Sequence, residues 1–537
     1  MTDIFDYVIV GAGSAGCVLA ARLAEAGNSV CLLEAGPIDR NPYIAIPSGY
    51  VKNIFDPRLT WGFKSEVLPG TEDRRVELTQ GRVVGGGSSI NGMIYNRGQA
   101  EDYDEWFAAG NTGWRYQDVL PYFKKAENRI GSGDDIYRGR GGPLLVSDLD
   151  MPDRLCDLFT RAALEYGYES VDDYNGLKQE GVGPWQFTMD PLKPFRRRVS
   201  VARAYLRPAL RTGRIALNTN SPATKIIFEG SRAAGVYFRA GGLNAPEQLV
   251  NAGKEVIICA GALNTPRLLQ LSGIGDGEHL RSIGVEVRRH APGVGANLTD
   301  HYQLRVAAKL RGIQTLNERG RGLRLAWEIV KWAAGAPSLV GMGPVLMRVF
   351  TRSNPELLRP DVQLSFTPGS FQVGLAGLLD RYPGMTCGGY QQRPQSRGYV
   401  KAISTEISVP PIIQPNYLAV ESDRLSMIFV VRMARKLLGA KAFSPYFVEE
   451  VFPGAKIESE SEIIDFALQA GGTAYHHVGT ARMGVEGDSM AVVNDQGCVH
   501  GMGGLRIVDA SIFPTITSGN TNAPVIMAAE KIADAIL

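Results

Sequence analysis

Three glycines near the N-terminus are spaced so that all of them could serve one turn of the backbone. Gly11, Gly13 and Gly16 form a Gly-x-Gly-x-x-Gly pattern, and Glu34 follows about 20 residues later. We expect Gly11 to allow a tight turn, Gly13 to let the backbone approach a pyrophosphate, and Gly16 to let a helix pack closely on a strand. Glu34 would then hydrogen-bond the ribose hydroxyls of an adenosine. The alternative is a glycine-rich turn without a ligand.

A histidine near the C-terminus lies in a segment that suits a loop wrapped around a ligand. His476 is one of six histidines, and residues 471–479 around it are rich in Gly, Ala and Thr. Histidine is the best base near neutral pH because its unperturbed pKa is about 6.5. A lone histidine is usually structural, so His476 is at this point only a candidate proton acceptor.

The glycine turn lies between elements that can hold it in place. Residues 7–10 are a continuous apolar run, as expected of a parallel strand buried on both faces. After the turn, Leu19 and Leu23 recur at helical spacing, and Gly27 stands where a helix C-cap belongs. Residues 30–33 form a second apolar run. The segment therefore predicts one complete βαβ unit.

Further elements return to the same sheet from distant parts of the chain. Residues 255–260 and 505–509 are predicted strands, and a terminal helix is expected over 524–537. Residues 35–150 are rich in Gly, Pro, Asn and Asp and are predicted to form extended loops around a site. From about 300 to 455 the pattern changes to mixed helix and strand. The fold class is therefore α/β, with a Rossmann-like domain.

Composition limits the classes of function. The chain has 537 residues, of which 44% are hydrophobic and 21% charged, with a net charge of +2. These values suggest two large domains or interleaved lobes. The three arginines at 196–198 are expected to lie in a solvated loop, because nucleic-acid binding usually needs a broader basic footprint. We therefore expect no nucleic-acid partner.

No segment predicts a membrane span or a signal peptide. Only six residues precede the first strand, and residues 323–350 are interrupted by charged side chains. This stretch could be an amphipathic surface that touches a membrane, but a helix packed on its own domain is the commoner structure. Six scattered cysteines without metal or CxxC spacing suggest reduced, intracellular usage. We expect a cytoplasmic protein that could also lie peripherally on a membrane.

The chain resembles the glucose–methanol–choline (GMC) oxidoreductase family over nearly its whole length, with choline-dehydrogenase-like and sorbose-dehydrogenase-like members as the nearest subgroup. The motifs that carry the resemblance are residues 81–93 with 97–98, residues 261–275, residues 292–301, Tyr475-His476, residues 479–484, Asp509-Ala510-Ser511 and residues 519–524. The resemblance implies FAD as the cofactor. It also implies a Rossmann-like FAD-binding domain interleaved with an α+β substrate-binding domain.

The resemblance also implies which residues bind the flavin. Gly87, Ser88 and Asn91 fall where the family's loop covers it, Ala223 where a backbone group meets the adenine, Asp509 and Ala510 beside the ribityl and pyrophosphate, and Asn520 and Thr521 at the isoalloxazine ring. The expected cofactor-binding set is Gly11, Gly13, Ser14, Ala15, Gly16, Glu34, Ala35, Gly87, Ser88, Asn91, Gly92, Met93, Ala223, Asp509, Ala510, Asn520 and Thr521. Family members with covalently bound FAD carry a His at the position of Ile90, so we expect the FAD here to be non-covalent.

The implied reaction is the oxidation of an alcohol to an aldehyde or ketone. His476 aligns with the family's catalytic base, and Asn520 with the second catalytic residue, which orients the substrate so that its hydride reaches the flavin N5 atom. His477 replaces a proline that is common in the family. It could tune His476, but a bystander turned away from the site is favoured.

Pro524 suits the first turn of the terminal helix, Asn522 is a plausible cap, and the dipole of this helix could favour a reduced flavin.

Other residues and partners complete the expectations. Arg82 and Arg97 could contact phosphate, but a structural role is preferred. Phe366, Phe371 and Tyr390 are candidate pocket walls, although such aromatics are more often core. We expect an alcohol substrate, an electron acceptor that is oxygen, a quinone or another carrier, and an association of identical subunits as an open alternative.

The domain interpretation divides the chain into five segments. Residues 1–150, 201–300 and 461–537 are assigned to FAD binding, and residues 151–200 and 301–460 to the substrate domain. The rival functions are an NAD(P)H-dependent monooxygenase, a flavin disulfide reductase, or an inactive FAD-bound scaffold. The absence of a CxxC and of a second Gly-x-Gly-x-x-Gly after a strand argues against the first two, and the presence of His476 and Asn520 against the third.

Overall fold

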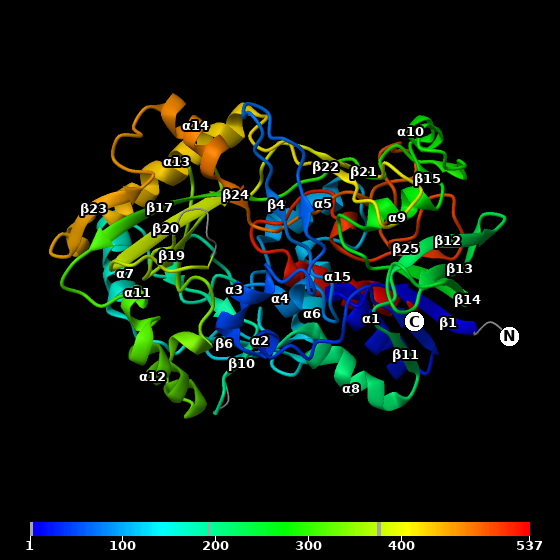
Figure 1. Cartoon of the computed structure of the whole chain (residues 1–537), viewed down its shortest axis with the longest axis horizontal. Coiled ribbons are helices and arrows are strands. Elements are labelled where there is room, and N and C mark those ends of the chain that lie inside the picture. The colour runs from blue at the N-terminus through cyan, green and yellow to red at the C-terminus, as the bar shows by residue number, and fades with distance from the viewer. Residues whose placement is uncertain (1–3, 192–193, 373–376) are drawn as a thin grey trace.

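A computed structural model describes residues 4–191, 194–372 and 377–537. It contains two large β-sheets that lie at opposite ends of the long axis of the molecule (Figure 1). Helices cover these sheets, and segments from all parts of the chain run between them. The predicted α/β class with a Rossmann-like domain is confirmed, because the first sheet has a parallel half built around the predicted βαβ unit.

The first sheet contains seven strands. They are ordered β11 (Ile215–Asn218), β2 (Val30–Leu33), β1 (Ile4–Val10), β14 (Glu247–Ile258), β13 (Arg232–Arg239) and β12 (Ala223–Glu229), with β25 (Leu505–Ile507) paired to β14. Neighbours from β11 to β14, together with β25, run parallel, whereas β13 and β12 are antiparallel. The apolar runs of β2 and the second half of β1 are buried, as expected for strands covered on both faces.

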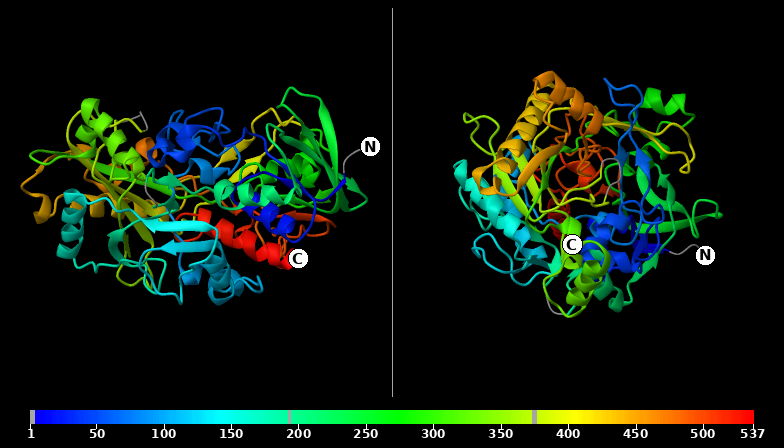
Figure 2. Two further views of the ribbon diagram at one scale, coloured as in Figure 1. Left: turned by 90° about the horizontal axis from the view of Figure 1, so that it is seen from below. Right: turned by 60° about the vertical axis from the view of Figure 1, so that its left-hand side comes forward.

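Three helices from distant segments pack together beside this sheet. They are α1 (Ser14–Glu25), α6 (Tyr116–Ala126) and α15 (Asn522–Ile536), and α15 contacts both of the others. Figure 2 shows α15 in red, running through the middle of the molecule beside blue N-terminal segments. The first sheet therefore gathers the N-terminal turn and the C-terminal helix at one place.

The second sheet is antiparallel along its main path. Its order is β23 (Phe447–Phe452), β17 (Tyr302–Leu310), β20 (Gly384–Gln391), β19 (Val362–Thr367), β18 (Met347–Thr351) and β7 (Gly181–Pro184), with β24 (Gly472–Thr473) paired to β17. Helices α7 (Arg154–Glu165) and α13 (Glu421–Leu438) pack on it. Alternation along β19 directs Leu364 and Phe366 into the core with these helices, and Gln363 and Ser365 toward a cavity.

Residues 35–150 contain more regular structure than the sequence interpretation allowed. At the start of α5 (Ala100–Ala108) and of α6, a carboxylate of the first turn, Asp102 or Asp118, accepts from the backbone amide of the residue before the helix. Tyr103 of α5 packs against Trp106 of the same helix and Phe123 of α6, and all three are buried. The prediction of extended loops is wrong here, because the many Gly and Asn residues between the helices obscured two short amphipathic patterns.

Helix α14 (Glu460–Ala470) and β24 lie with the second sheet, although the sequence interpretation grouped 461–537 with FAD binding. Helix α14 packs on α13, and β24 pairs with β17. The second sheet thus reaches along the chain to Thr473, three residues before His476. This continuity places the candidate base at the point where the chain leaves the second sheet.

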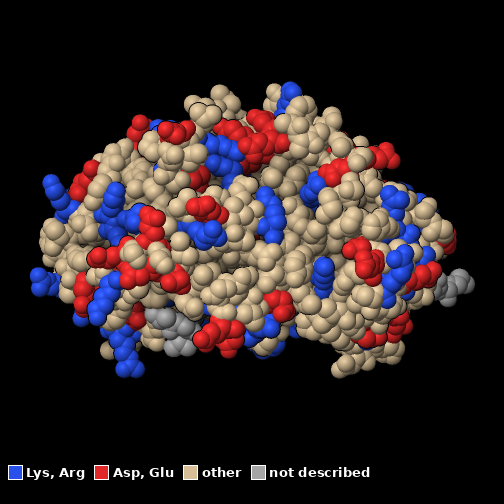
Figure 3. Space-filling view, turned by 90° about the horizontal axis from the view of Figure 1, so that it is seen from above, with Lys and Arg blue, Asp and Glu red and all other residues tan. Residues whose placement is uncertain are grey.

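Two surface expectations are corrected. Arg196 and Arg198 are buried, because Arg196 pairs with Asp150 and Arg198 bonds to backbone carbonyls, so residues 196–198 are not a solvated loop. Helix α12 (Gly322–Ala333) turns Glu328 inward but leaves most of its apolar side chains exposed, so it is not simply packed on its own domain. Lysines and arginines are interspersed with acidic residues on the face shown in Figure 3.

Among the described residues, no helix combines the length and the apolar character needed to cross a bilayer.

Candidate active site

A cavity of about 510 Å³ lies between the two sheets. This volume falls within the range of roughly 300 to 1,000 Å³ that is typical of ligand sites. The expected residues that line it are Gly11, Gly13, Ser14, Ala15, Glu34, Ala35, Gly87, Asn91, Gly92, Met93, Ala223, His476, Asp509, Ala510, Asn520 and Thr521. Gly16 and Ser88 do not line it. The structure thus brings together residues that are as much as 510 positions apart in the chain.

The three glycines of the N-terminal turn meet three different steric demands. Gly11 has φ +102°, and a Cβ there would lie 2.5 Å from the Cys259 carbonyl oxygen. A Cβ on Gly16 would lie 1.9 Å from the Gly11 carbonyl oxygen, so Gly16 permits helix packing and does not face the cavity. A Cβ on Gly13 would meet no protein atom closer than 3.9 Å. Only Gly13 therefore leaves space for a ligand, and α1 begins at the next residue with unpaired N–H groups.

Two carboxylates hold the backbone at the ends of the parallel strands. Glu34 accepts hydrogen bonds from the Ala12 and Gly36 amides at 3.0 and 2.8 Å. Asp509 accepts from the Gly261 amide and the Thr265 hydroxyl at 2.8 and 2.6 Å. Burial raises the pKa of both groups. Each carboxylate oxygen has further lone pairs, so Glu34 can still accept from ribose hydroxyls.

The loop that follows the 81–87 glycine-rich run is held from behind by two residues. Ser88 donates to the Gly85 carbonyl oxygen and accepts from the Val201 amide, so its side chain is turned away from the cavity. Arg198 donates to Asn91 Oδ1 at 2.8 Å, and Asn91 itself lines the cavity. Burial lowers the pKa of Arg198 to about 9. Sequence reasoning missed this role of Arg198 because it treated the three adjacent arginines alike.

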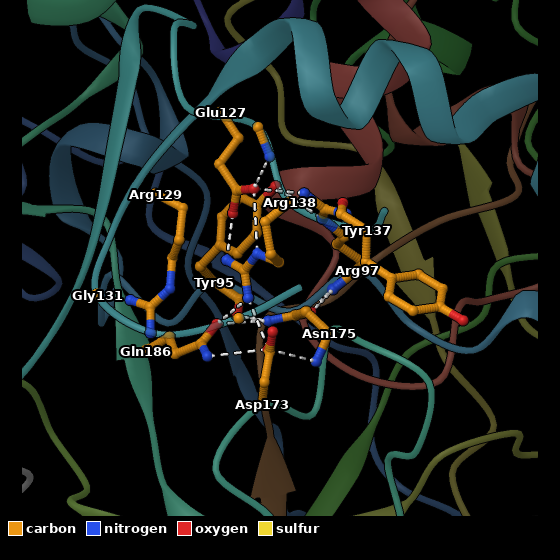
Figure 4. Close-up of polar contacts among 12 residues, drawn as sticks. Tyr95, Arg97, Glu127, Arg129, Gly131, Tyr137, Arg138, Asp173, Asn175 and Gln186 are labelled. Carbon is orange, nitrogen blue, oxygen red and sulfur yellow. Dashed lines mark hydrogen bonds and ion pairs between the residues drawn. The ribbon is translucent and has the colours of Figure 1, made fainter. Parts of the chain in front are cut away.

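Arg82 and Arg97 stay outside the cavity, which supports the structural role preferred for both. Arg82 donates to the Pro57 carbonyl oxygen and lies over the Trp61 ring. Arg97 is 1% exposed and forms a 2.6 Å ion pair with Glu127, which also pairs with Arg138 (Figure 4). The contacts in Figure 4 join Arg97, which follows the 81–93 motif, to residues 127–138 and to Asn175.

His476 lies in a chain of hydrogen bonds that determines where its proton sits. His301 Nε2 is 2.8 Å from the Gln392 carbonyl oxygen, and because a carbonyl only accepts, Nε2 must carry the hydrogen. Burial lowers the pKa of His301 to about 4, so this ring is neutral and its Nδ1 is an acceptor. His476 Nδ1 lies 2.9 Å from that atom and must donate to it. The lone pair of His476 that can accept a hydrogen bond is therefore on Nε2.

That lone pair lies beside the second candidate residue. Asn520 Nδ2 is 2.9 Å from His476 Nε2 and donates to it. Both side chains line the cavity. Asn520 Oδ1 is buried and has no hydrogen-bond partner among the described residues. A substrate hydroxyl placed here could donate to His476 Nε2 and accept from the Asn520 amide.

Asp300 fixes the turn that presents His476. Its Oδ1 accepts from the His476 amide at 2.8 Å, and its Oδ2 accepts from the Thr473 hydroxyl. Tyr475 has φ +65°, a left-handed conformation that is uncommon for a residue with a large side chain. The Asp300 bonds hold the backbone in this conformation. Asp300 and His301 lie in a family landmark noted in the sequence, but nothing in their local pattern indicated that they would meet residues 473–476.

The local electrostatics favour a neutral base. Burial, together with the neighbouring His301 and His477, holds the pKa of His476 well below 6.5. The N-terminus of α15 also lines the cavity through Thr521 and Asn522, which brings the positive end of a helix dipole to this place. Asn522 is not the cap of α15. It is the first helical residue, and its Oδ1 accepts from the Ser14 hydroxyl at 2.7 Å.

Other expectations near the site are partly corrected. His477 lines the cavity with its Nε2 3.5 Å from Asp300 Oδ2, so it is not turned away. Tyr390 forms part of the cavity wall. Phe366 stacks on Phe159 in the core, as strand alternation requires, and Phe371 does not line the cavity.

The shape and chemistry of the cavity fit FAD. The lining includes the Gly13 opening and the start of α1 for phosphates, with Glu34 for a ribose. It also includes a neutral histidine, together with Asn520 and His477, each of which has an unpaired buried polar atom. An extended dinucleotide would thus have its phosphates at a helix N-terminus and its reactive ring near a proton acceptor.

Comparisons with known proteins agree with this arrangement. The models of the N- and C-terminal domains of the GMC oxidoreductases match residues 5–303 and 394–529. An oxygen-dependent choline dehydrogenase of Rhizobium etli is 40% identical, covering 99% of this chain and 95% of that protein. One of Staphylococcus saprophyticus is 38% identical and covers 100% and 95%.

Solved structures show the same fold. A pyridoxine 4-oxidase from Mesorbium loti superposes with a TM-score of 0.86 at 28% identity, covering 100% of this chain and 99% of that one. An FAD-dependent oxidoreductase from Chaetomium thermophilum has a TM-score of 0.90 at 26% identity, covering 99% of each chain. The likeness therefore extends over both sheets.

Proposed function

This chain belongs to the GMC oxidoreductase family, and we propose that it oxidises an alcohol with His476 as the base and Asn520 as the residue that orients the substrate. It is an FAD-dependent oxidoreductase that acts on CH–OH donors. Bound FAD supplies the acceptor for the hydride that leaves the carbinol carbon. The alternatives of a disulfide reductase, a monooxygenase or an inactive scaffold are not favoured.

The side chains near the cavity would act in sequence on the hydroxyl group. Asn520 Nδ2 donates to the substrate oxygen, and His476 Nε2 accepts the hydroxyl proton. His301 keeps the other His476 nitrogen protonated and so keeps this lone pair available. Positioning of this kind can lower a barrier by several kcal/mol. The hydrogen-bond chain from Gln392 to Asn520 is the observation that carries the proposal.

Anaerobic reduction of the flavin by alcohols tests the proposal directly. We expect the absorbance of the oxidised flavin to bleach when a suitable alcohol is added without oxygen. A panel of primary and secondary alcohols should include choline, because relatives are named for it. Absence of bleaching by every alcohol would contradict the proposed function.

Molecular oxygen is the acceptor that we propose for the reduced flavin. The two choline dehydrogenases that are similar to this chain are named as oxygen-dependent, which supports this choice. Admitting oxygen to the alcohol-reduced protein should restore the yellow colour and produce hydrogen peroxide. Slow reoxidation by oxygen together with rapid reoxidation by a quinone would favour a quinone instead.

We predict that the FAD is dissociable. Ile90 lines the cavity at the position where a histidine would be needed for a covalent link, and an isoleucine side chain offers no nucleophile. Precipitation of the holoenzyme with acid should therefore leave the yellow flavin in the supernatant. Flavin that remains in the protein pellet after washing would show a covalent bond at another residue.

We also predict the acid limit of flavin reduction. The pKa of His476 is held below 6.5, so the neutral form that can accept a proton persists when the pH falls to that value. Activity should be lost only at lower pH, as His476 becomes protonated. Stopped-flow measurement of reduction from about pH 5 to about pH 9 checks this. An acid limb centred above 6.5 would contradict the assigned environment of His476.

A further inference from the structure

Three adjacent strands of the second sheet place a row of polar side chains beside His476. Gln303 of β17 is paired with Tyr390 of β20, and Tyr390 is paired with Gln363 of β19. All three line the cavity. The Tyr390 ring lies 5.8 Å from the His476 ring, measured between centroids. A molecule whose hydroxyl reaches His476 would therefore place its remaining part along this row.

The row consists of neutral hydrogen-bonding groups. Burial raises the pKa of Tyr390 well above its usual value, so its hydroxyl keeps its proton. The Gln363 amide lies close to this hydroxyl, but the two do not form a hydrogen bond of normal geometry, and the Gln363 Oε1 atom and the Tyr390 hydroxyl are both buried without a partner. Gln303 donates from its Nε2 atom to the Thr473 carbonyl oxygen. Its Oε1 atom is therefore the group that could accept a hydrogen bond from a substrate. Unpaired buried polar atoms are costly, and a change of side-chain rotamer at Gln363 would let a polar substrate group bond to them.

The charged groups around the cavity are unsuited to a cationic substrate. Of the described residues that line it, only Glu34 and Asp509 carry carboxylates. Both follow strands of the first sheet, at the end assigned to the dinucleotide, and their oxygens accept bonds from backbone amides. Near His476 the positive end of α15 faces the cavity, and the Asp300 carboxylate, which does not line the cavity, is already bonded to the His476 amide and the Thr473 hydroxyl. A buried cation without a carboxylate partner is strongly disfavoured.

Two of the aromatic rings that line the cavity, Tyr390 and Trp61, offer limited compensation. A quaternary ammonium can be held over the faces of aromatic side chains. The Tyr390 ring, however, already stacks on His301 with centroids 4.3 Å apart. The Arg82 guanidinium lies 5.6 Å from the Trp61 ring centroid, so a second cation at Trp61 would be repelled by the first.

We propose that the substrate is an uncharged alcohol with a second hydrogen-bonding group, which binds to the row formed by Gln303, Tyr390 and Gln363. The inference rests on the proposed alcohol oxidation and specifies its substrate class. It separates this chain from a choline-oxidising enzyme, although proteins named choline dehydrogenases are 38–40% identical to it. Met93, Pro344 and Val345 also line the cavity and would contact the apolar part of such a molecule.

Three probes of nearly equal shape test this proposal with the holoenzyme. Choline carries a trimethylammonium group, 3,3-dimethyl-1-butanol replaces it with an uncharged tert-butyl group, and 3-methyl-1,3-butanediol replaces one methyl group of the latter with a hydroxyl. The ratio of the limiting reduction rate to Kd, from anaerobic stopped-flow traces, is compared. We expect the diol to exceed the tert-butyl alcohol by about 10-fold, as one additional hydrogen bond allows, and choline to be the poorest.

Two variants assign the preference to the row. Gln363→Leu should bring the ratio of the diol to 3,3-dimethyl-1-butanol close to one, whatever the variant does to the rate with each probe alone. Gln303→Glu introduces a carboxylate of the same size and should raise the ratio for choline relative to the tert-butyl alcohol by at least about 10-fold, because an ammonium would gain a charged partner. The Gln303→Leu variant should not show this gain.

The outcomes separate this inference from the proposed function. If choline reduces the wild-type flavin at least as efficiently as the uncharged probes, the substrate class is wrong and the alcohol oxidation stands. If the diol has no advantage over the tert-butyl alcohol, or Gln363→Leu leaves its advantage intact, the role of the row is wrong. If no alcohol of the wider panel reduces the flavin, the proposed function fails and this inference fails with it.

Discussion

Replacement of His476 by alanine is expected to slow anaerobic reduction of the flavin by about 10²- to 10⁴-fold, the usual contribution of a positioned general base. The physical reason is the loss of the Nε2 lone pair, which no other described side chain beside Asn520 supplies in the same position. FAD should remain bound, because the variant leaves unchanged the Gly13 turn and Glu34, which would hold its phosphates and ribose. Stopped-flow reduction and the flavin absorbance of the purified variant measure the two quantities.

Matched histidine variants make this test specific. His290→Ala removes an exposed histidine whose Nδ1 accepts from the Gly277 amide, outside the cavity, and should leave the rate unchanged. His477→Ala removes a histidine that lines the cavity but does not bond to Asn520, and should have a much smaller effect than His476→Ala. Equal losses for the two neighbouring histidines would reject His476 as the base.

The same residues show what the sequence could predict. The first βαβ unit is local: its apolar runs, glycine spacing and acidic residue lie within residues 4–34, and the structure reproduces each element within a few residues. Such patterns can be predicted because the spacing of apolar residues within each strand or helix indicates which of its faces is buried. The resemblance added residues 476 and 520, and the structure places their side chains 2.9 Å apart.

The residues that position His476 and other parts of the site could not be predicted in this way. His301 is 175 residues from His476, and the bond between them depends on how β17 and β24 pair. Arg198 is distinguished from Arg197 only by which face of a short strand it occupies. Asn522 has the composition of a helix cap, yet the approach of Ser14 gives its side chain another partner. In each case a tertiary contact decided the role, and local spacing carried no signal of it.

The electrostatic design of the cavity also emerges only in three dimensions. Acidic residues occur throughout the chain, yet among the described residues that line the cavity only Glu34 and Asp509 are acidic, and both bond to backbone amides, whereas the candidate base is a neutral histidine and the N-terminus of α15 faces the cavity. A neutral base can accept the proton of the substrate, and a positive helix end favours the negative charge that leaves the substrate with the hydride. This arrangement arises because the two sheets meet across the cavity.

Substitution of Gly13 by valine is expected to weaken FAD binding by at least about 100-fold without unfolding the protein. A Cβ at Gly13 would have no protein atom within 3.9 Å, and the residue has an extended conformation (φ −83°, ψ −159°) that valine can adopt. The added methyl groups would instead occupy the space where a pyrophosphate approaches the amides of α1. Loss of two hydrogen bonds to a charged group, at about 1.5 to 3 kcal/mol each, corresponds to a 100-fold weaker Kd or more.

The contrasting variant Gly16→Val shows why this outcome is diagnostic. A Cβ there would lie 1.9 Å from the Gly11 carbonyl oxygen, so the backbone itself must move and the free energy of unfolding should fall by roughly 3 kcal/mol or more. Gly487→Val, where a Cβ meets nothing within 4 Å, controls for the substitution itself. Thermal unfolding of the apoproteins and titration with FAD separate the effects. If Gly13→Val binds FAD normally, or loses as much stability as Gly16→Val, the opening at Gly13 is not the phosphate site. Normal apoprotein stability with lost FAD affinity would locate the phosphates at the start of α1. Gly11 and Gly16 cannot give this result, because a side chain at either position would collide with the protein's own backbone.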